Sequence, residues 1–317
     1  MRYCHLPGLP IGYNFTGFGR YHMIILDGGL GRELQAMGAP FRQPEWSALA
    51  LMEGPDYVRA AHDAFLQAGA DIVTTNSYAI VPFHIGAGVF AARASSLLRL
   101  SGELARTAAD EAGRSVRVAG SVPPMFGSYQ PEKFDRQAAA DMMRLFRDQL
   151  ADYADLFLAE TLGSVAEAEL FLSEFLPVGR PVWLSVTLED VDVTADEPRL
   201  RSGEPLGDVL ALCQSLSPDA LLFNCSQPEV MEDAVSVAHA HFSGDSTPLI
   251  GVYANAFPLA DDNYQGANAT LHELRSDITP DAYADYAERW AAAGAGIIGG
   301  CCGISPRHIK CLKDRLA

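Results

Sequence analysis

Three of the six cysteines stand where they could bind one metal ion together. Cys225 follows one short apolar segment, and the adjacent pair Cys301 and Cys302 follows another. Three thiolates supply three ligands to zinc and leave a fourth position open for an exogenous ligand. Soft sulfur ligands favour zinc over magnesium or calcium. A disulfide between the adjacent cysteines, or small thiols packed at a strand end, would account for the same residues.

Short apolar segments alternate with helical patterns along the chain, and these elements must position the thiols. The apolar segments cover residues 23–26, 70–75, 116–122, 155–159, 181–186, 220–223, 248–253 and 297–299. The helical patterns cover residues 55–67, 89–112, 137–153, 165–172, 206–216, 228–241, 280–293 and 306–316. Apolar strands alternating with helices predict a parallel sheet covered by helices. About eight such units favour an α/β fold with a single (β/α)8 TIM-type barrel over a doubly wound open sheet.

In such a barrel the C-terminal ends of the strands carry the chemistry, so a zinc site is expected at the C-terminal rim. Nearly every apolar segment ends in polar side chains. They are Asp27, Thr75, Asn76, Ser121, Glu160, Thr161, Ser185, Thr187, Asn224, Tyr253 and Asn255, besides the three cysteines. Any one of them could be an ordinary loop residue. Because all would converge on one rim, the set predicts a binding site there.

Composition limits the partners and the location of the protein. The chain has 317 residues and a formal net charge of −17, which argues against a nucleic-acid partner. No apolar segment approaches the roughly 20 residues of a membrane span. Residues 1–22 lack the pattern of a signal peptide, and the sparse cysteines favour a reducing, cytoplasmic location. We expect residues 1–22 to be an N-terminal extension and residues 23–317 to form the barrel, with a homo-oligomer allowed.

Several segments resemble the motifs of the homocysteine S-methyltransferase family, in the order in which the family has them. Residues 299–309, Gly-Gly-Cys-Cys-Gly-Ile-Ser-Pro-Arg-His-Ile, resemble its zinc-binding signature. Asn224 with Cys225 resembles the motif that carries the first zinc ligand. Residues 26–34, 69–71 with 75–78, and 159–161 resemble its motifs at the N-terminus and at the second and fourth strands. The resemblance spans nearly the whole chain and implies a zinc-bearing barrel that methylates homocysteine.

The resemblance also implies how the acceptor substrate is held. Cys225, Cys301 and Cys302 would bind Zn²⁺, with the homocysteine sulfur as the fourth ligand. Zinc coordination deprotonates a bound thiol, and methylation requires the thiolate. Asp27 and Glu160 correspond to the acidic residues that hold the α-amino group, a charge-assisted hydrogen bond. No catalytic residue beyond the zinc centre is predicted.

Further residues are expected around the acceptor and the methyl donor. Backbone N–H groups at Gly28 and Gly29 could bind the substrate carboxylate. Asn224 is placed with these substrate-site residues, where it would orient its loop or bond a neighbouring strand. The candidates for contact with a cationic donor are Trp46, Tyr78, Thr161, Tyr253 and Asn255. Betaine-using relatives carry tyrosine where Thr161 stands, so S-methylmethionine is the preferred donor, and S-adenosylmethionine is also allowed.

Two other functions fit the same residues. The acceptor could be another small thiol or a selenol. The protein could also be a non-catalytic zinc- or thiol-binding protein that senses redox state through Cys301 and Cys302. Each function takes small molecules as its partners. The non-catalytic protein would bind thiols but form no methionine from any donor.

Overall fold

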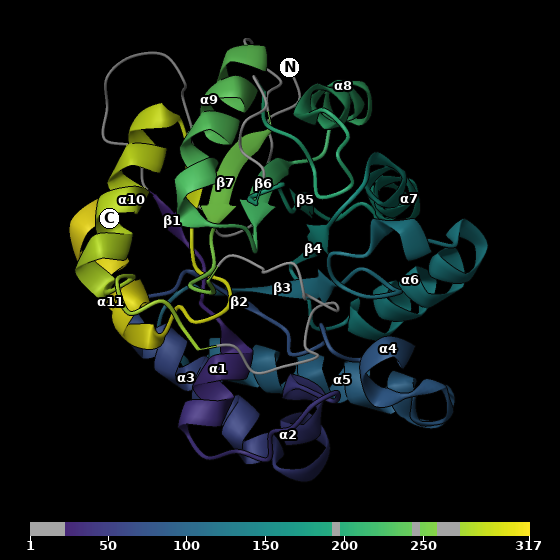
Figure 1. The fold of residues 1–317 in the computed structure, drawn as a ribbon. Helices are drawn as coiled ribbons and strands as arrows, with labels where there is room; N and C mark the ends of the chain where they lie inside the picture. The colour runs from purple at the N-terminus through teal and green to yellow at the C-terminus, as the bar shows by residue number, and fades with distance from the viewer. Residues whose placement is uncertain (1–22, 192–196, 243–247, 259–272) are drawn as a thin grey trace.

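The fold is a closed ring of eight parallel strands surrounded by helices (Figure 1). A computed structural model describes residues 23–191, 197–242, 248–258 and 273–317. The strands are β1 (Ile24–Ile25), β2 (Ile72–Thr74), β3 (Arg117–Val122), β4 (Leu156–Leu162), β5 (Val182–Val186), β6 (Ala220–Asn224), β7 (Leu249–Tyr253) and β8 (Ile297–Ile298). A parallel bridge between Leu26 and Ile72 joins the first strand to the second and closes the ring. The predicted (β/α)8 barrel is confirmed, and the predicted extension at 1–22 lies outside the described residues.

The helices form the outer layer of the barrel (Figure 1). They are α1 (Leu30–Ala36), α2 (Ser47–Glu53), α3 (Pro55–Ala68), α4 (Pro82–Ile85), α5 (Ala87–Glu111), α6 (Arg136–Leu150), α7 (Val165–Phe175), α8 (Leu206–Leu216), α9 (Met231–His241), α10 (Pro280–Ala293) and α11 (Pro306–Leu316). The patterns in the sequence locate the long helices to within about three residues, the usual uncertainty at helix ends. They miss α1, α2 and α4, because one or two turns are too short to show a period.

Alternation along the strands decides which side chains enter the barrel. In β4, Leu156 and Leu158 belong to the apolar cluster inside the ring, while Phe157 and Ala159 pack against the outer helices. Successive side chains of a strand point to opposite faces. The same alternation directs Glu160 inward, at the mouth of the barrel. A hydrophobic floor of strand residues therefore lies below a carboxylate at the C-terminal rim.

Three aspartates fasten the opposite, N-terminal end of the barrel. Each precedes an even-numbered strand, and its carboxylate accepts a hydrogen bond from a backbone N–H of the neighbouring odd-numbered strand. The pairs are Asp71 with Ile25 (3.0 Å), Asp155 with Val118 (2.8 Å) and Asp219 with Val182 (2.8 Å). Lys313 of α11 also lies 3.1 Å from Asp71, which ties the end of the chain to the second strand. Asp71, part of a motif in the sequence, therefore has a structural role.

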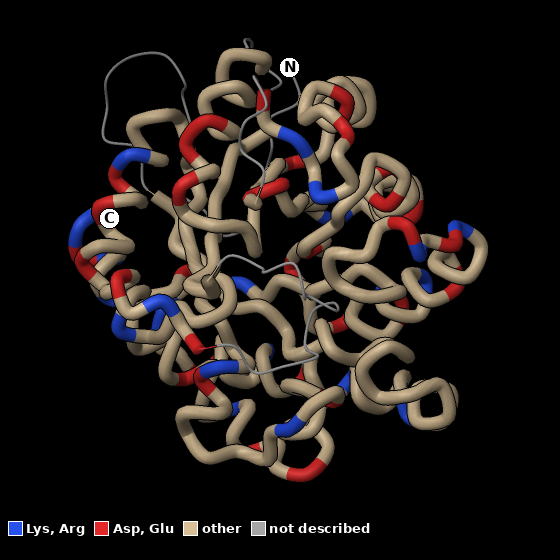
Figure 2. The backbone as a smooth tube through the Cα atoms, in the orientation of Figure 1, with Lys and Arg blue, Asp and Glu red and all other residues tan. Residues whose placement is uncertain are grey.

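Charged residues of both signs are spread over the outer helices in the view of Figure 2. Many of them pair across neighbouring helices, as Arg144 of α6 does with Glu174 of α7 at 2.9 Å. Exposed pairs of this kind contribute little stability each, about 0–1 kcal/mol. No helix in the described ranges is long and apolar enough to cross a membrane.

Candidate active site

A cavity of about 370 Å³ opens at the C-terminal ends of the strands. It is lined by residues that follow strands on all sides of the barrel, from Asp27 after β1 to Cys301 after β8. The predicted metal, substrate and donor residues all line it except Asn224, while Ser121, Ser185 and Thr187 of the polar rim set do not line it. The structure thus brings together residues from near both ends of the described chain, such as Asp27 and Cys302, which are 275 positions apart.

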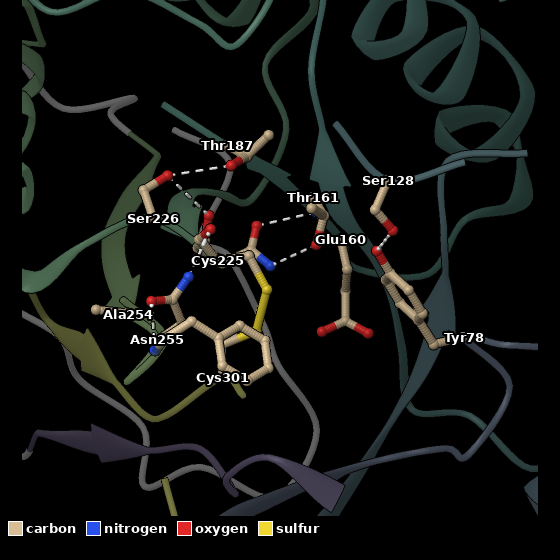
Figure 3. The surroundings of a disulfide bond; sticks show 12 residues. Tyr78, Ser128, Glu160, Thr161, Thr187, Cys225, Ser226, Ala254, Asn255 and Cys301 are labelled. Carbon is tan, nitrogen blue, oxygen red and sulfur yellow. Dashed lines mark hydrogen bonds between the residues drawn. A yellow bond between two sulfur atoms is a disulfide. The ribbon is translucent and has the colours of Figure 1, made fainter. Parts of the chain in front are cut away.

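The sulfur atoms of Cys225, Cys301 and Cys302 all lie within 4.8 Å of one another. Cys225 and Cys301 form a disulfide, whose Cα atoms are 5.7 Å apart, and Cys302 is free (Figure 3). The disulfide between adjacent cysteines, considered as an alternative from the sequence, is therefore wrong. A disulfide and a shared metal ion both require sulfur atoms within a few ångströms. The reduced cluster could accordingly hold a metal ion.

The backbone at Cys225 adopts an unusual conformation that its surroundings maintain. Its φ of 53° lies in the left-handed region, which residues other than glycine rarely adopt. The carbonyl of Cys225 accepts hydrogen bonds from the Tyr129 hydroxyl and the Asn255 side-chain amide, both at 3.0 Å. Such strain persists where the surrounding structure over-determines it, often at functional sites. Asn255, a predicted donor contact, lines the cavity but uses its amide to hold this peptide.

Asn224 bonds neighbouring strands, as expected from the sequence, and acts on the site as a positioning residue. Its side-chain oxygen accepts hydrogen bonds from the Thr161 N–H at 2.9 Å and the Ser185 hydroxyl at 2.7 Å. Its amide donates to the Thr161 hydroxyl at 2.9 Å. Asn224 is fully buried and does not line the cavity. These bonds hold Thr161 at a φ of 61° and so fix the backbone beside Glu160 and Cys225.

Gly28 and Gly29 allow two loops to approach closely, and the Gly29 N–H, expected near a substrate carboxylate, already has a partner in the protein. That N–H donates to the Ile304 carbonyl at 2.8 Å. A Cβ atom on Gly28 would lie 2.3 Å from the Ile304 oxygen, and one on Gly29 would lie 2.4 Å from the Cys301 oxygen. Both positions exclude any side chain, because backbone atoms cannot yield at such distances. The glycines therefore hold the cysteine loop against the first strand.

Asp27 and Glu160 place two carboxylates at the cavity wall. Asp27 accepts hydrogen bonds from the N–H of Thr74 at 2.7 Å and from the Thr74 hydroxyl, while Glu160 accepts one from the Ser121 hydroxyl. Burial raises the pKa of Asp27 to about 7, and the nearby Glu160 adds to the increase. Burial also raises the pKa of Glu160 to about 7. Among the described residues, neither carboxylate pairs with a lysine, arginine or histidine, so both are available to a cation that enters the cavity.

Comparison with known proteins agrees with this cluster of thiols and carboxylates. The family model described as homocysteine S-methyltransferase matches residues 24–316. The chain belongs to the homocysteine S-methyltransferase family. It is 33% identical to a homocysteine S-methyltransferase of Escherichia coli over 314 residues, covering 92% of this chain and 95% of that protein. A homocysteine S-methyltransferase 1 of Zea mays is 30% identical over 319 residues, covering 92% and 94%.

A solved structure supports both the family and the fold. The metallated form of the homocysteine methyltransferase MmuM from Escherichia coli superimposes with a TM-score of 0.74 and 30% identity. The match covers 93% of this chain and 96% of that one. The resemblance predicted from the motifs is therefore confirmed, and the chain is classed among methyltransferases.

The aromatic residues that were predicted to contact the methyl donor also line the cavity. The hydroxyls of Tyr78 and Ser128 share a hydrogen bond of 2.5 Å, and Figure 3 shows Glu160 between Tyr78 and the disulfide. Tyr253 is buried beside Glu160, and burial together with that carboxylate raises the pKa of the Tyr253 hydroxyl well above its usual value. These phenols therefore remain neutral and can face a cation with their rings.

Trp46 differs from the expectation because a cation of the protein already lies over its ring. The guanidinium carbon of Arg32 lies 5.8 Å from the centre of the Trp46 ring and 5.2 Å from that of Phe257. Trp46 itself has a φ of 53°. Arg32 belongs to the motif at residues 26–34, but the sequence by itself indicates no role for it.

Sequence reasoning missed a second group of lining residues altogether. They are Tyr129, Asp190, Arg201, Gln227 and Phe257. They lie in loops after different strands, where no hydrophobic period marks a residue as facing the site. The one signal in the sequence for this group is the acidic composition of the loop after β5, residues 189–205.

Proposed function

We propose that the protein transfers a methyl group from a sulfonium donor to the thiolate of homocysteine, giving methionine. One observation carries the proposal: three clustered sulfur atoms and two buried carboxylates line the same cavity. The sulfur atoms suit a soft metal ion and the carboxylates suit an ammonium group. A cavity of about 370 Å³ lies within the usual range for small-molecule sites.

The donor atoms fit zinc. A tetrahedral zinc ion with bonds of about 2.3 Å to sulfur needs those atoms roughly 3.8 Å apart. The three sulfur atoms, all within 4.8 Å of one another, reach that separation with small movements once the disulfide is reduced. Cys225, Cys301 and Cys302 would hold the ion and leave one position for the substrate. When bound, zinc supplies the chemistry that keeps the substrate sulfur as a nucleophilic thiolate.

The two carboxylates orient the acceptor. Asp27 and Glu160 would share the α-ammonium group of homocysteine through charge-assisted hydrogen bonds. Thr74 and Ser121 hold one carboxylate each, so both are fixed before the substrate arrives. The binding of an ammonium favours the ionised forms and lowers the raised pKa of each. This fixed geometry directs the substrate sulfur toward the cysteine cluster, a positioning effect.

The other side of the cavity suits a cationic donor. Tyr78 and Tyr253 offer neutral aromatic rings, and the ionised carboxylates, together with the three thiolates once they hold zinc, would make the cavity anionic. A sulfonium placed there would be attracted by both features. The methyl carbon must lie in line between the donor sulfur and the acceptor sulfur, and the walls of the cavity would enforce this alignment. S-methylmethionine is the preferred donor.

A panel of donors tests the proposal. Reduced, zinc-loaded protein is incubated with homocysteine and with S-methylmethionine, S-adenosylmethionine or betaine, and methionine is quantified by chromatography. We expect methionine from a sulfonium donor and none from betaine. Cysteine, whose sulfur is one methylene closer to the α-carbon, replaces homocysteine as the control for the acceptor, and equal turnover of the two would show that the site does not select homocysteine. Absence of methionine with both sulfonium donors would refute the proposal.

A further inference from the structure

Three loops form a closed ring of contacts beside the cysteine cluster. The Tyr129 hydroxyl donates to the Cys225 carbonyl at 3.0 Å, and two residues further on the Gln227 N–H donates to Asp190 at 3.0 Å. The other oxygen of Asp190 accepts a hydrogen bond from Arg201 at 2.6 Å. The ring closes where the Arg201 guanidinium carbon lies 4.9 Å from the centre of the Tyr129 ring. These contacts join the loops after β3, β5 and β6.

Arg201 is held from behind and faces the cavity. Nη1 donates to Asp190 and lies 4.0 Å from a Glu189 oxygen, and Tyr129 covers one face of the guanidinium. In the described part of the chain, its Nε is buried and has no hydrogen-bond partner. The side chain is 14% exposed and lines the cavity. An arginine oriented by an aspartate and an aromatic ring presents the rest of its planar donor array in one direction, which suits a carboxylate.

Two arginines line the described part of the cavity, on opposite sides of the barrel. Arg32 follows β1 and Arg201 follows β5, and these strands are diametrically opposed in a closed ring of eight. Arg32 lies between the rings of Trp46 and Phe257, on the side of Asp27. Arg201 lies across the barrel from Asp27 and Arg32, and it follows the strand next to the one that carries Glu160. The two amino-acid substrates of the proposed reaction would each have a carboxylate to place in an otherwise anionic cavity.

We propose that Arg201 binds the carboxylate of the methyl donor, so that the site selects amino-acid sulfonium donors. The proposal rests on the proposed function. Asp190 is a positioning residue that orients the guanidinium. Tyr129 is a second positioning residue, because it contacts Arg201 with its ring and the Cys225 carbonyl with its hydroxyl. One rigid aromatic side chain thus sets the distance between the donor's carboxylate and the sulfur centre.

The experiment compares a donor that has the carboxylate with one that lacks it. S-methylmethionine and its carboxamide are titrated into the reduced, zinc-loaded protein by calorimetry, and KM is measured for each. Arg201→Met should weaken the binding of S-methylmethionine roughly 10- to 100-fold, which is the range for a lost charge-assisted hydrogen bond. The same substitution should leave the affinity for the carboxamide, the KM for homocysteine and the zinc content unchanged. Arg199→Met is the matched control, since Arg199 lies in the same loop and pairs outside the cavity with Glu197.

A double variant and a comparison of the two donors on wild-type protein separate the loss of a donor contact from other effects of the substitution. Arg201→Met leaves Asp190 without its cation, so the double variant with Asp190→Asn repeats the measurement without an unpaired buried charge. Wild-type protein should itself bind the acid more tightly than the carboxamide. Equal binding of the two donors by wild-type protein, or loss of donor binding in Arg32→Met but not in Arg201→Met, would overturn the assignment. Failure of wild-type protein to form methionine would instead count against the proposed function, because the binding comparison does not depend on turnover.

Discussion

Replacing Asn224 with alanine tests the claim that this side chain holds the site together. The change removes three buried hydrogen bonds, to the N–H and hydroxyl of Thr161 and to the hydroxyl of Ser185. An unsatisfied buried N–H costs about 1–3 kcal/mol and each of the two lost hydroxyl bonds about 0.5–1.5 kcal/mol, so the free energy of unfolding should fall by about 4 kcal/mol. Thr161, no longer held at positive φ, should relax toward ordinary backbone angles.

The matched control is Asn76→Ala. Asn76 is as deeply buried as Asn224, and its side chain makes one hydrogen bond in the described residues, from its amide to the Ser47 carbonyl at 3.1 Å. Its replacement should cost about 1 kcal/mol. Urea unfolding of both variants, followed by fluorescence and by circular dichroism, gives the free energies, and metal analysis gives the zinc content. Asn224→Ala should also retain zinc poorly, because Asn224 directly precedes Cys225.

An equal loss of stability in the two variants would contradict the positioning role of Asn224. Full zinc content together with an unchanged KM for homocysteine in Asn224→Ala would also contradict it. Either result would mean that the hydrogen bonds of Asn224 merely satisfy buried groups and do not position Thr161, Glu160 and Cys225.

Three further predictions concern the metal, the carboxylates and the glycines. Cys302→Ser should abolish zinc retention and methyl transfer, whereas Cys213→Ala, in a buried helix of the outer layer, should retain both; metal analysis that finds full zinc in the first variant contradicts the ligand set. Because burial raises the pKa of both site carboxylates to about 7 and ammonium binds their ionised forms, homocysteine affinity should fall as the pH drops below about 7. Binding near pH 7 should release protons, seen by calorimetry in buffers of different ionisation enthalpy, and an equal heat in all buffers would argue against this. Gly29→Ala should displace the cysteine loop and weaken zinc binding, while Gly88→Ala, where a Cβ meets no atom within 4 Å, should not; equal metal affinity would exclude the close-approach argument.

The fold and the principal site residues could be predicted from the sequence, because their signals are local. Eight apolar segments between helical patterns indicate a parallel barrel, and a parallel barrel exposes the C-terminal ends of its strands at one rim. Since Cys225, Cys301 and Cys302 follow such segments, a barrel fold is enough to predict that they lie near one another at this rim. Glu160 enters the same cavity by the alternation of β4. The motifs added the family and the acceptor, which the periodicity by itself leaves open.

Tertiary structure alone decided which side chains use their polar atoms on the protein and which leave them to a ligand. Asn224 and the Gly29 N–H look like substrate contacts in a motif, yet both are consumed by partners on distant segments, Thr161 and Ile304. Tyr129 and Arg201 carry no periodic signal, because loops are placed by long-range packing and not by local pattern. Whether a polar atom already has a hydrogen-bond partner depends on residues that come together from distant parts of the chain. Only the folded structure therefore shows which polar atoms remain available to a ligand.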